Sequence, residues 1–291
     1  MNRHPYATPA YAESFGMGHI DVPEWRTSLL VRPIPDTSWS DALGCYPLTA
    51  LHRDADLAAG LDRLRAAGLV SVALVPDPLT GPSPEALAAA FPVCRPFKTH
   101  YLIDREAGPV RFGNTHRKQV NRSYRALNIT ATDIRRNDGE WIRTYQHTVE
   151  RHGVTGIANF APCYFAALAK MTEATVVAAF REDRMVAMAV WIRSGDIAYG
   201  HIGGASDVGH QFYAMYGVIA TATTHFADCQ VIHLGGVAGN AEDPDDGLVF
   251  FKKGFANRQV TAHLCGAVLD EHRYGLLVAG RSPTTFFPEY R

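Results

Sequence analysis

Residues 174–205 read ATVVAAFREDRMVAMAVWIRSGDIAYGHIGGA, and this stretch decides the fold of the chain. It holds three apolar runs rich in β-branched and aromatic residues, which are joined by the short polar connections REDR and SGD. Apolar runs separated by two to four polar residues are typical of neighbouring strands in an antiparallel sheet. The stretch therefore predicts a three-stranded antiparallel meander.

Helical patterns precede and follow the meander. Upstream, WIRTYQHTVERHGV (141–154) is amphipathic and ends at Gly153, and APCYFAALAKM (161–171) predicts another helix. Downstream, GHQFYAMYGVIATATTHFADC (209–229) predicts one long helix, and QVIHLGG (230–236) predicts a further strand. This order of helices, meander, long helix and strand indicates an α/β fold.

A first α/β unit is predicted before residue 108. Residues 1–55 are rich in proline, aromatic and turn residues, which indicates irregular structure with short strands such as SLLVRPI. Helices then alternate with strands in the order LAAGLDRLRAAG, LVSVALVP, SPEALAAAF and FKTHYLID. In the third of these segments, Ser83 is placed to cap a helix that has Pro84 at its first position.

The segment REAGPVRFGN separates this unit from the rest of the chain, and we place a domain boundary at Gly108-Pro109. The expected organisation is an N-terminal unit of residues 1–108, which residues 257–291 could complete, and a second unit of residues 109–256. A chain of 291 residues is long enough for two such units to bury hydrophobic cores.

The composition is that of a globular protein. The chain is 47% hydrophobic and 20% charged, and it has no apolar run near 18 residues, which excludes both disorder and membrane spanning. The start MNRHPYATPAYAES lacks the apolar core of a secretory signal, so we expect a cytoplasmic protein with no membrane partner. The five cysteines form no CxxC pair and the thirteen histidines no HExxH or HxH motif, so neither a disulfide framework nor a metal site is predicted.

Positive charge is concentrated in one part of the chain. Residues 105–136 include eight Lys or Arg against two acidic residues, although the net charge of the whole chain is −1. Within this window THRKQVNRSYRALN predicts a helix with Val120, Tyr124 and Leu127 on its apolar face. Such a helix presents either a solvated basic face or a site for phosphate groups. Its candidate phosphate-binding residues are Arg117, Lys118, Arg122 and Arg125.

A second unusual segment is LVFFKKGFANRQV (248–260), which sets Lys252 and Lys253 in an apolar frame. We expect a strand here, on which neighbouring side chains point to opposite faces, so the two lysines need not have the same role. One interpretation is a strand end whose lysines reach solvent along their aliphatic stems. The other is that one lysine faces a negative charge, because apolar surroundings would keep water from screening it.

Three segments together resemble the FemAB branch of the GNAT-type acyltransferases, which move an amino acid from aminoacyl-tRNA onto a peptide. They are the basic helix THRKQVNRSYRAL, the helix TYQHTVERHGV with the strands that follow it, and LGG...DDGLVFFKKGF. In the last, Phe251-Lys252 before Gly254-Phe255 matches the Phe-Lys pair that the family has shortly before Gly-Phe. The resemblance covers about residues 110–256, and RPFKTHYLID matches the family more weakly. It implies two GNAT-like units packed side by side, the second being catalytic.

The resemblance also implies an activity and its partners. The enzyme would form a peptide bond between a tRNA-borne amino acid and the free amine of a peptide. Short members of the family act in uridyl peptide antibiotic assembly of the pacidamycin type, where alanine is added to a peptide N-terminus. The expected partners are therefore alanyl-tRNA and a peptide acceptor, free or tethered to a carrier protein. No cofactor is expected, because the ester supplies the activation.

Specific roles follow for the matching residues. The ammonium of Lys252 would stabilise the oxyanion or help protonate the departing ribose oxygen, and Phe251 would shape and dry the pocket. Tyr199, Tyr213 and Tyr216 would line the cleft or stack on the terminal adenosine, with burial in the core as the alternative. No base is assigned, because the acidic residues near the motif, Asp243, Asp245 and Asp246, lie in a glycine-rich loop. The phosphate-binding set of the basic helix would be extended by Arg151 and Lys253.

Three other functions remain open. An acyl-CoA-dependent N-acyltransferase of the same fold would hold pyrophosphate on a [QR]xxGx[GA] loop, but the nearest segment, RAAGLV at 65–70, ends a predicted helix and has valine at its last position. A cell-wall peptide-bridge enzyme is a second alternative, although no heptad-patterned helical arm is present. A non-catalytic binding module is the third, and it predicts that Lys252→Met leaves function intact.

Overall fold

The computed structural model describes residues 3–136, 139–153, 156–237, 246–282 and 284–291. Contacts within the chain divide it into two compact units, unit 1 with Met1–Phe97 and Thr261–Arg291 and unit 2 with Lys98–Val260. The division falls inside strand β5 (Val93–Asp104), earlier in the chain than the Gly108-Pro109 position chosen from composition. Unit 2 is thus continuous in sequence, whereas unit 1 is assembled from two segments.

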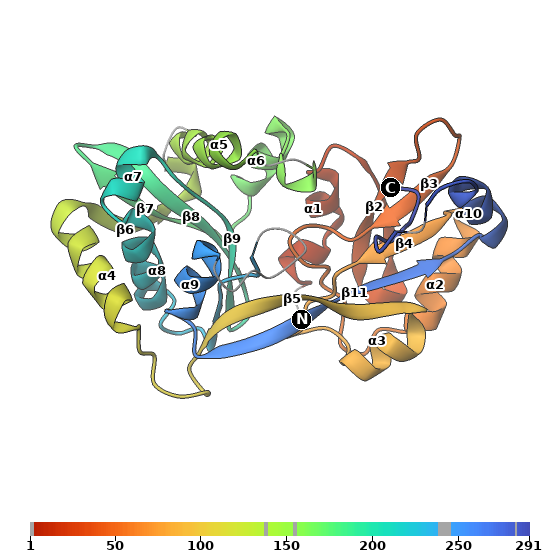
Figure 1. The fold of residues 1–291 in the computed structure, drawn as a ribbon, viewed down its shortest axis with the longest axis horizontal. Helices are drawn as coiled ribbons and strands as arrows, with labels where there is room; N and C mark the ends of the chain where they lie inside the picture. Colours follow the sequence, from red (N-terminus) through yellow and green to blue (C-terminus); the bar gives the residue numbers. More distant parts are fainter. Residues whose placement is uncertain (1–2, 137–138, 154–155, 238–245, 283) are drawn as a thin grey trace. The chain divides into compact units, whose positions relative to one another are not determined.

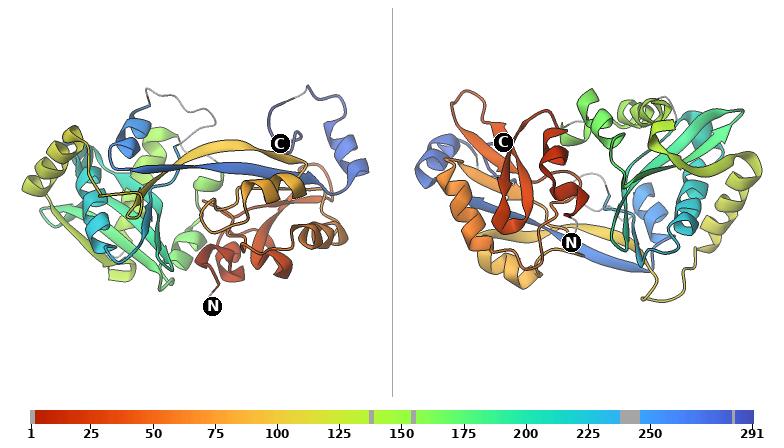
Figure 2. Two further views of the ribbon diagram at one scale, coloured as in Figure 1. Left: turned by 90° about the horizontal axis from the view of Figure 1, so that it is seen from below. Right: turned by 180° about the vertical axis from the view of Figure 1, so that it is seen from behind.

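Unit 1 is built on a mixed sheet with the strand order β1-β2-β3-β4-β11. Strands β3 and β4 are parallel and the other neighbours are antiparallel, with Cys265 of β11 opposite Leu74 of β4. Helices α2 and α3 contact each other and lie against this sheet (Figure 1 and Figure 2). The strand bounds are Gly18–Val22 (β1), Thr27–Pro33 (β2), Ser40–Leu43 (β3), Ser71–Leu74 (β4) and Arg258–Val268 (β11).

The helices of unit 1 form where capping residues and leucine spacing predict them. Helix α2 (Leu57–Ala66) buries leucines against strand β4, and Asp56 caps it by accepting the Ala59 amide at 3.0 Å. Helix α3 (Pro84–Ala90) starts at the predicted proline, with the Ser83 hydroxyl as its cap. The remaining helices of this unit are η1 (Pro5–Ala7), α1 (Pro9–Glu13), η2 (Pro23–Trp25) and α10 (Glu271–Val278).

The close approach of α2 to Trp25 explains a glycine inside this helix and supports a stability prediction. A Cβ at Gly60 would lie 1.9 Å from the buried Trp25 indole nitrogen, which donates to the Asp56 carbonyl at 3.0 Å. We expect Gly60→Ala to lower the free energy of unfolding by about 1–3 kcal/mol, because overpacking outweighs the better helix propensity of alanine.

The matched control is Gly275→Ala in helix α10, where a Cβ would meet nothing within 4 Å. This change is expected to raise the free energy of unfolding by about 0.5–1 kcal/mol, because it only removes the flexibility of glycine. Both variants can be compared by urea unfolding. Equal stabilisation by the two substitutions would contradict the packing of α2 on Trp25.

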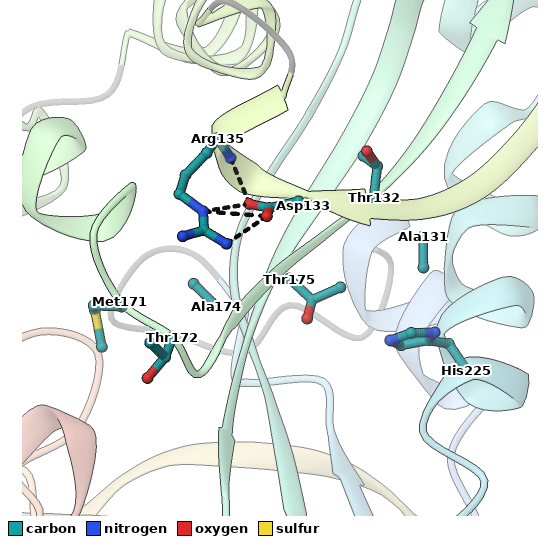
Figure 3. A pocket seen from close by; sticks show the side chains of 9 residues that line it. All are labelled: Ala131, Thr132, Asp133, Arg135, Met171, Thr172, Ala174, Thr175 and His225. Carbon is teal, nitrogen blue, oxygen red and sulfur yellow. Dashed lines mark hydrogen bonds and ion pairs between the residues drawn. The ribbon is translucent and has the colours of Figure 1, made fainter.

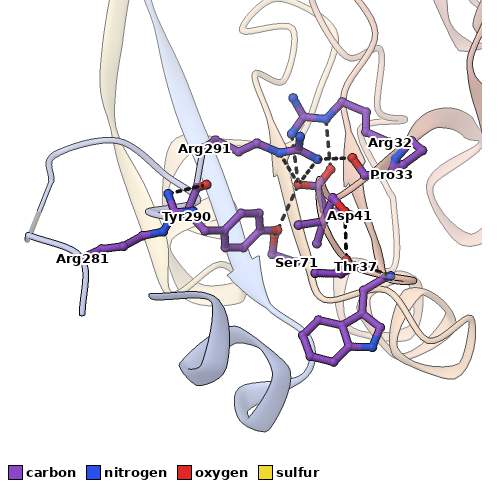
Figure 4. Close-up of polar contacts among 10 residues, drawn as sticks. Arg32, Pro33, Thr37, Asp41, Ser71, Arg281, Tyr290 and Arg291 are labelled. Carbon is purple, nitrogen blue, oxygen red and sulfur yellow. Dashed lines mark hydrogen bonds and ion pairs between the residues drawn. The ribbon is translucent and has the colours of Figure 1, made fainter. Parts of the chain in front are cut away.

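A buried carboxylate joins the C-terminal segment to the sheet of unit 1 (Figure 4). Asp41 on β3 is fully buried, and it accepts hydrogen bonds from the Arg32 and Arg291 guanidinium groups at 3.0 Å and from the Tyr290 hydroxyl at 3.0 Å. The Tyr290 hydroxyl also lies 2.7 Å from the hydroxyl of Ser71 on β4. Paired and hydrogen-bonded in this way, the buried charge is compensated.

Unit 2 contains the predicted meander, which is confirmed with all three strands and both turns. Strands β7 (Ala174–Arg181), β8 (Arg184–Ser194) and β9 (Ile197–Ala205) pair antiparallel, with Arg181 opposite Arg184 and Ser194 opposite Ile197. The sheet order of this unit is β5-β10-β9-β8-β7-β6, in which only β10 and β9 are parallel among the described pairs. The meander is flanked by β6 (Asn128–Asp133), which pairs with β7, and by β10 (Val231–His233), which pairs with β9.

Helices cover both faces of the meander, and two adjacent glycines of β9 show which helix covers which face. A Cβ at Gly203 would contact Met215 of α8, whereas a Cβ at Gly204 would lie 2.6 Å from the Thr144 carbonyl of α5. Because successive strand residues point to opposite faces, α8 (Ala214–His225) and α5 (Glu140–His152) lie on opposite sides of the sheet. Helix α4 (Asn114–Ala126) packs on α8 (Figure 1).

Two predictions in unit 2 are wrong in detail. The single helix predicted over 209–229 is divided into α7 (Asp207–Gln211) and α8, because Tyr213 adopts a positive φ of 54° between them. The predicted apolar face of α4 includes Val120 and Leu127, but Tyr124 is 46% exposed and Ser123 is buried instead. The remaining helices of this unit are η3 (Ile134–Arg136), η4 (Gly156–Ala158), α6 (Pro162–Leu168) and α9 (Gly247–Lys253).

Candidate active site

Lys252 lies in the last turn of helix α9, and not on a strand as the sequence predicted. The helix begins after Asp246, whose carboxylate accepts the Leu248 amide at 2.7 Å. Strand β11 starts only at Arg258. An apolar run this short does not reveal its period, which is why helix and strand could not be told apart. On the helix Lys253 is exposed, whereas Lys252 is partly buried, so the two lysines do differ in environment.

The ammonium of Lys252 is held by the segment that follows strand β10. Its Nζ donates a hydrogen bond to the carbonyl of Gly236. Gly235 has a φ of +73°, and a Cβ at this position would lie 3.6 Å from the Lys252 Nζ. A second cation, Lys98 on β5, donates to the carbonyl of the next residue, Val237, at 3.1 Å. Gly236 and Val237 therefore present two successive carbonyls to two lysines.

The surroundings of Lys252 weaken its hold on a proton. The pKa of Lys252 is lowered to about 7, first by burial and second by the charge of nearby Lys98, with Asp246 acting in the opposite direction. Burial also lowers the pKa of Lys98. Near neutral pH, Lys252 is therefore divided between its ammonium and amine forms, unlike an exposed lysine.

Two buried histidines of strands β5 and β10 contact each other near Lys252. The Nδ1 atom of His100 on β5 is 3.0 Å from the Nε2 atom of His233 on β10. Burial lowers the pKa of His233 to about 3, with Lys252 as the second cause, so this imidazole stays neutral. The predicted pocket residue Tyr199 is fully buried, with its ring 5.3 Å from that of His233.

Aromatic rings pack around the other side of the Phe-Lys motif. The ring of Phe251 meets Tyr216 of α8 edge to face at 4.9 Å, and both contact Phe255. His116 of α4 belongs to this cluster, and its Nε2 is 2.9 Å from the Phe251 carbonyl. A Cβ at Gly254 would lie 2.0 Å from the His116 ring, so the glycine of the motif makes room for this histidine.

Sequence reasoning missed three groups of this site, Lys98, His100 and His116. His100 contacts His233, His116 contacts Phe251, and Lys98 acts on Lys252, and each of these contacts joins segments that are far apart in the chain. The glycines supply a partial signal, because a Gly-Gly pair and the glycine of FFKKGF both mark places where another group approaches the backbone.

The cations of helix α4 lie together on its exposed surface. Arg117, Lys118, Arg122 and Arg125 are all exposed, and among the described residues none of them forms an ion pair. Asn114, Arg117, Lys118 and Asn121 line an open pocket of about 410 Å³ at the start of the helix. The guanidinium of Arg122 lies 4.5 Å from the centre of the Tyr213 ring. Arg151, predicted to join this set, is instead paired with Asp207 at 2.7 Å.

A second pocket of about 310 Å³ lies at the edge strand β6 (Figure 3). Three threonines, His225 and the Asp133–Arg135 ion pair line it, with 2.6 Å between the charged atoms. None of the residues chosen from the sequence lines this pocket. Lys252 lines neither of the two pockets.

Other sequence expectations concern metals, membranes and acidic residues. No group of three potential ligands among the described residues could hold a metal ion. No helix in the described part of the chain combines the length and apolar character needed to cross a bilayer. Asp246 caps helix α9, whereas Asp243 and Asp245 lie outside the described residues.

Comparison with solved structures identifies the fold. The chain is similar to the C-terminal domain of a protein from Agrobacterium fabrum assigned as a lysylphosphatidylglycerol synthetase, with a TM-score of 0.63 and 13% identity over 92% of this chain and 88% of that one. It is similar to FemX with a TM-score of 0.60 and 12% identity, covering 86% of each chain. L-PGS from Bacillus licheniformis gives a TM-score of 0.57 and 11% identity over 91% of this chain and 93% of that one.

These likenesses confirm the α/β fold predicted from the sequence, which is the fold of FemX. No protein-family model matches the chain, and no curated protein sequence matches it.

Proposed function

We propose that this protein is an aminoacyltransferase that uses aminoacyl-tRNA. It transfers the aminoacyl group, alanyl in the favoured case, to the free amine of a peptide intermediate in antibiotic biosynthesis. The proposed place of reaction is the cytoplasm, and the acceptor is free or tethered to a carrier protein. The observation that carries the proposal is the Lys252 ammonium, which is partly buried and held on a backbone carbonyl inside a motif of the FemAB type.

The chemistry needs little more than position and charge. Attack of a neutral amine on the ester carbonyl forms the carbon–nitrogen bond, places negative charge on the carbonyl oxygen, and ends with departure of the ribose oxygen. A fixed cation beside that oxygen lowers the barrier. Lys252 is suited to this role because water is largely kept away from it, so its charge is less screened than that of exposed Lys253.

The aromatic cluster supports the same role. The ring of Phe251 packs against Tyr216 and Phe255, and its carbonyl is hydrogen-bonded to His116. These contacts fix the helical turn that carries Lys252. A rigid frame of this kind keeps a catalytic group in position without reorganisation during the reaction. In this proposal Phe251 and Tyr216 shape the site, whereas Tyr199 acts as core support.

The exposed cations of helix α4 are proposed to hold the RNA. Their guanidinium and ammonium groups have no carboxylate partner among the described residues, so they are available to phosphates. The ring of Tyr213 beneath Arg122 offers a platform for stacking. Arg151 and Lys253 are kept as candidates for further phosphate contacts, and Arg151 would have to exchange Asp207 for the phosphate.

A direct test is incubation with radiolabelled alanyl-tRNA and a panel of short peptides, with and without earlier ribonuclease digestion. We expect a labelled peptide that requires intact tRNA. The same panel with other charged tRNAs reports the amino acid, and a parallel incubation with alanyl-CoA reports the rival donor. Product that survives ribonuclease, or that forms only from the thioester, would refute the proposal.

The role of helix α4 gives a separate prediction. We expect the double change Arg117→Gln and Lys118→Gln to weaken tRNA binding, and to reduce the slope of log affinity against log salt by about 2, because two phosphate contacts are lost. Binding is measured by fluorescence anisotropy with labelled tRNA at several salt concentrations. The matched control is Arg135→Gln, which removes an exposed arginine that already pairs with Asp133. An unchanged slope in the double variant would remove α4 from the RNA surface.

A further inference from the structure

We propose that Lys98 is a positioning residue of the active site, whose positive charge acts together with burial to determine the charge that Lys252 carries near neutral pH. The two lysines come from different elements, strand β5 and helix α9, and their ammonium groups donate to the successive carbonyls of Val237 and Gly236. Lys98 lies in the segment RPFKTHYLID, and its place in the site follows from the pairing of β5 with β10.

The glycines after β10 make this arrangement possible. A Cβ on Gly236 would lie 3.0 Å from the His100 ring and 3.4 Å from the Cβ of Lys98. Gly235 has a positive φ of 73°, a conformation that favours glycine, and a Cβ there would stand 3.6 Å from the Lys252 Nζ. The segment therefore lets both side chains approach the same short piece of backbone.

Among the described residues, charged and titratable groups act on Lys252 from three elements. Lys98 acts on it from β5, Asp246 from the start of α9 and the imidazole of His233 from β10, and His233 in turn contacts His100 of β5. Asp246 is the carboxylate that acts on Lys252 within this part of the chain, and the Leu248 amide already occupies one of its oxygens. Burial lowers the pKa of His233 to about 3, so this imidazole is uncharged. Lys98 and Lys252 are both partly buried, and like charges at short range favour loss of a proton.

The consequence for catalysis rests on the proposed function. If the Lys252 ammonium must face the developing negative charge, activity falls as pH rises through about 7, the pKa of Lys252. Lys98 would then set the pH at which this falling limb occurs. Lys98 need not contact the substrate to shift the falling limb of the pH profile, because it acts through Lys252.

The charge coupling can be measured without any assay of activity. The protein is labelled with lysine that carries ¹³C at the ε carbon, and its lysine signals are recorded by NMR. The Lys252 resonance is assigned by its absence from Lys252→Arg. Its chemical shift is then followed from pH 5 to 11. The wild-type midpoint is expected near 7. Lys98→Met is expected to raise it by about one pH unit, because burial, the larger cause of the lowered pKa, remains. Lys98→Arg keeps the cation and is expected to leave the midpoint in place.

Lys253→Met is the matched control, since this exposed lysine is adjacent in the same helix and should not move the midpoint. An unchanged midpoint in Lys98→Met, or an equal shift in Lys98→Arg, would overturn the inference. Should Lys98→Met fail to fold, a wild-type midpoint above about 9 would still overturn it, because Lys252 would then titrate almost as an exposed lysine does.

The test of the charge coupling and the test of the proposed function can fail independently. A shift in Lys98→Met without any aminoacyl transfer by the wild type would keep the charge coupling and reject the reaction. Transfer by the wild type without a shift would keep the reaction and reject the role of Lys98. In the pH profile of an active enzyme, the falling limb should move upward in Lys98→Met together with the resonance.

Discussion

Replacing Lys252 with methionine is expected to reduce the rate of aminoacyl transfer by about 10²- to 10³-fold, because it removes the cation beside the developing oxyanion. Methionine keeps most of the apolar volume of the lysine stem, so the packing of α9 should survive. The measurement is kcat and KM for labelled peptide formation at saturating alanyl-tRNA. The loss is expected in kcat, since the cation acts on charge that appears only in the transition state.

Lys253→Met is the control for this substitution as well. It removes a cation one residue away that is exposed, so any lost affinity for tRNA should appear in KM and leave kcat nearly unchanged. A Lys252→Met enzyme with wild-type kcat would support the non-catalytic alternative, in which the protein only binds its partners. Circular dichroism and thermal melting of both variants separate a catalytic loss from unfolding.

Replacing Asp41 with alanine is expected to lower the free energy of unfolding by about 3–5 kcal/mol. The carboxylate is fully buried, and its removal leaves Arg32, Arg291 and the Tyr290 hydroxyl without their shared acceptor. The two arginines are only partly exposed, so water can replace the lost partner incompletely. Urea unfolding at neutral pH measures the change.

The matched control is Asp62→Ala in unit 1. Asp62 forms an ion pair with Arg65 at 2.7 Å, but both side chains are largely exposed, so the loss should stay below about 1 kcal/mol. Tyr290→Phe removes the hydroxyl that bonds both Asp41 and Ser71, and its loss is expected to lie between the two, at about 1–2 kcal/mol. A loss for Asp41→Ala no larger than that for Asp62→Ala would mean that the buried cluster adds nothing to stability.

Local patterns predicted the secondary structure where they were long and had turns at both ends. The meander is the best case, since REDR and SGD mark its two turns and the three apolar runs are rich in β-branched and aromatic residues. Helix α3 was predicted from its cap Ser83 and the proline at its start, and helix α2 from the spacing of its leucines. In each case the residues that determine the element lie inside it or next to it.

Prediction failed where a short segment has an ambiguous pattern and where a distant contact decides the outcome. The segment around Lys252 is a helix because Asp246 caps it, although its composition also suits a strand. The break between α7 and α8 depends on one residue, Tyr213, with a positive φ. For the site, the motif pointed to Lys252 and Phe251. Lys98 and His116 lie in the other segments that resemble the family, but their nearness to the Phe-Lys motif depends on the fold.

The two-segment origin of unit 1 matters for synthesis on the ribosome. Strand β4 pairs with β3 on one side, but its other neighbour, β11, emerges only after the whole of unit 2 has been translated. Until then the β4 edge of the nascent chain has unsatisfied amide and carbonyl groups, which is the kind of edge that invites association with other chains. Completion of the first-made half of the protein is therefore postponed until its last strand has left the exit tunnel.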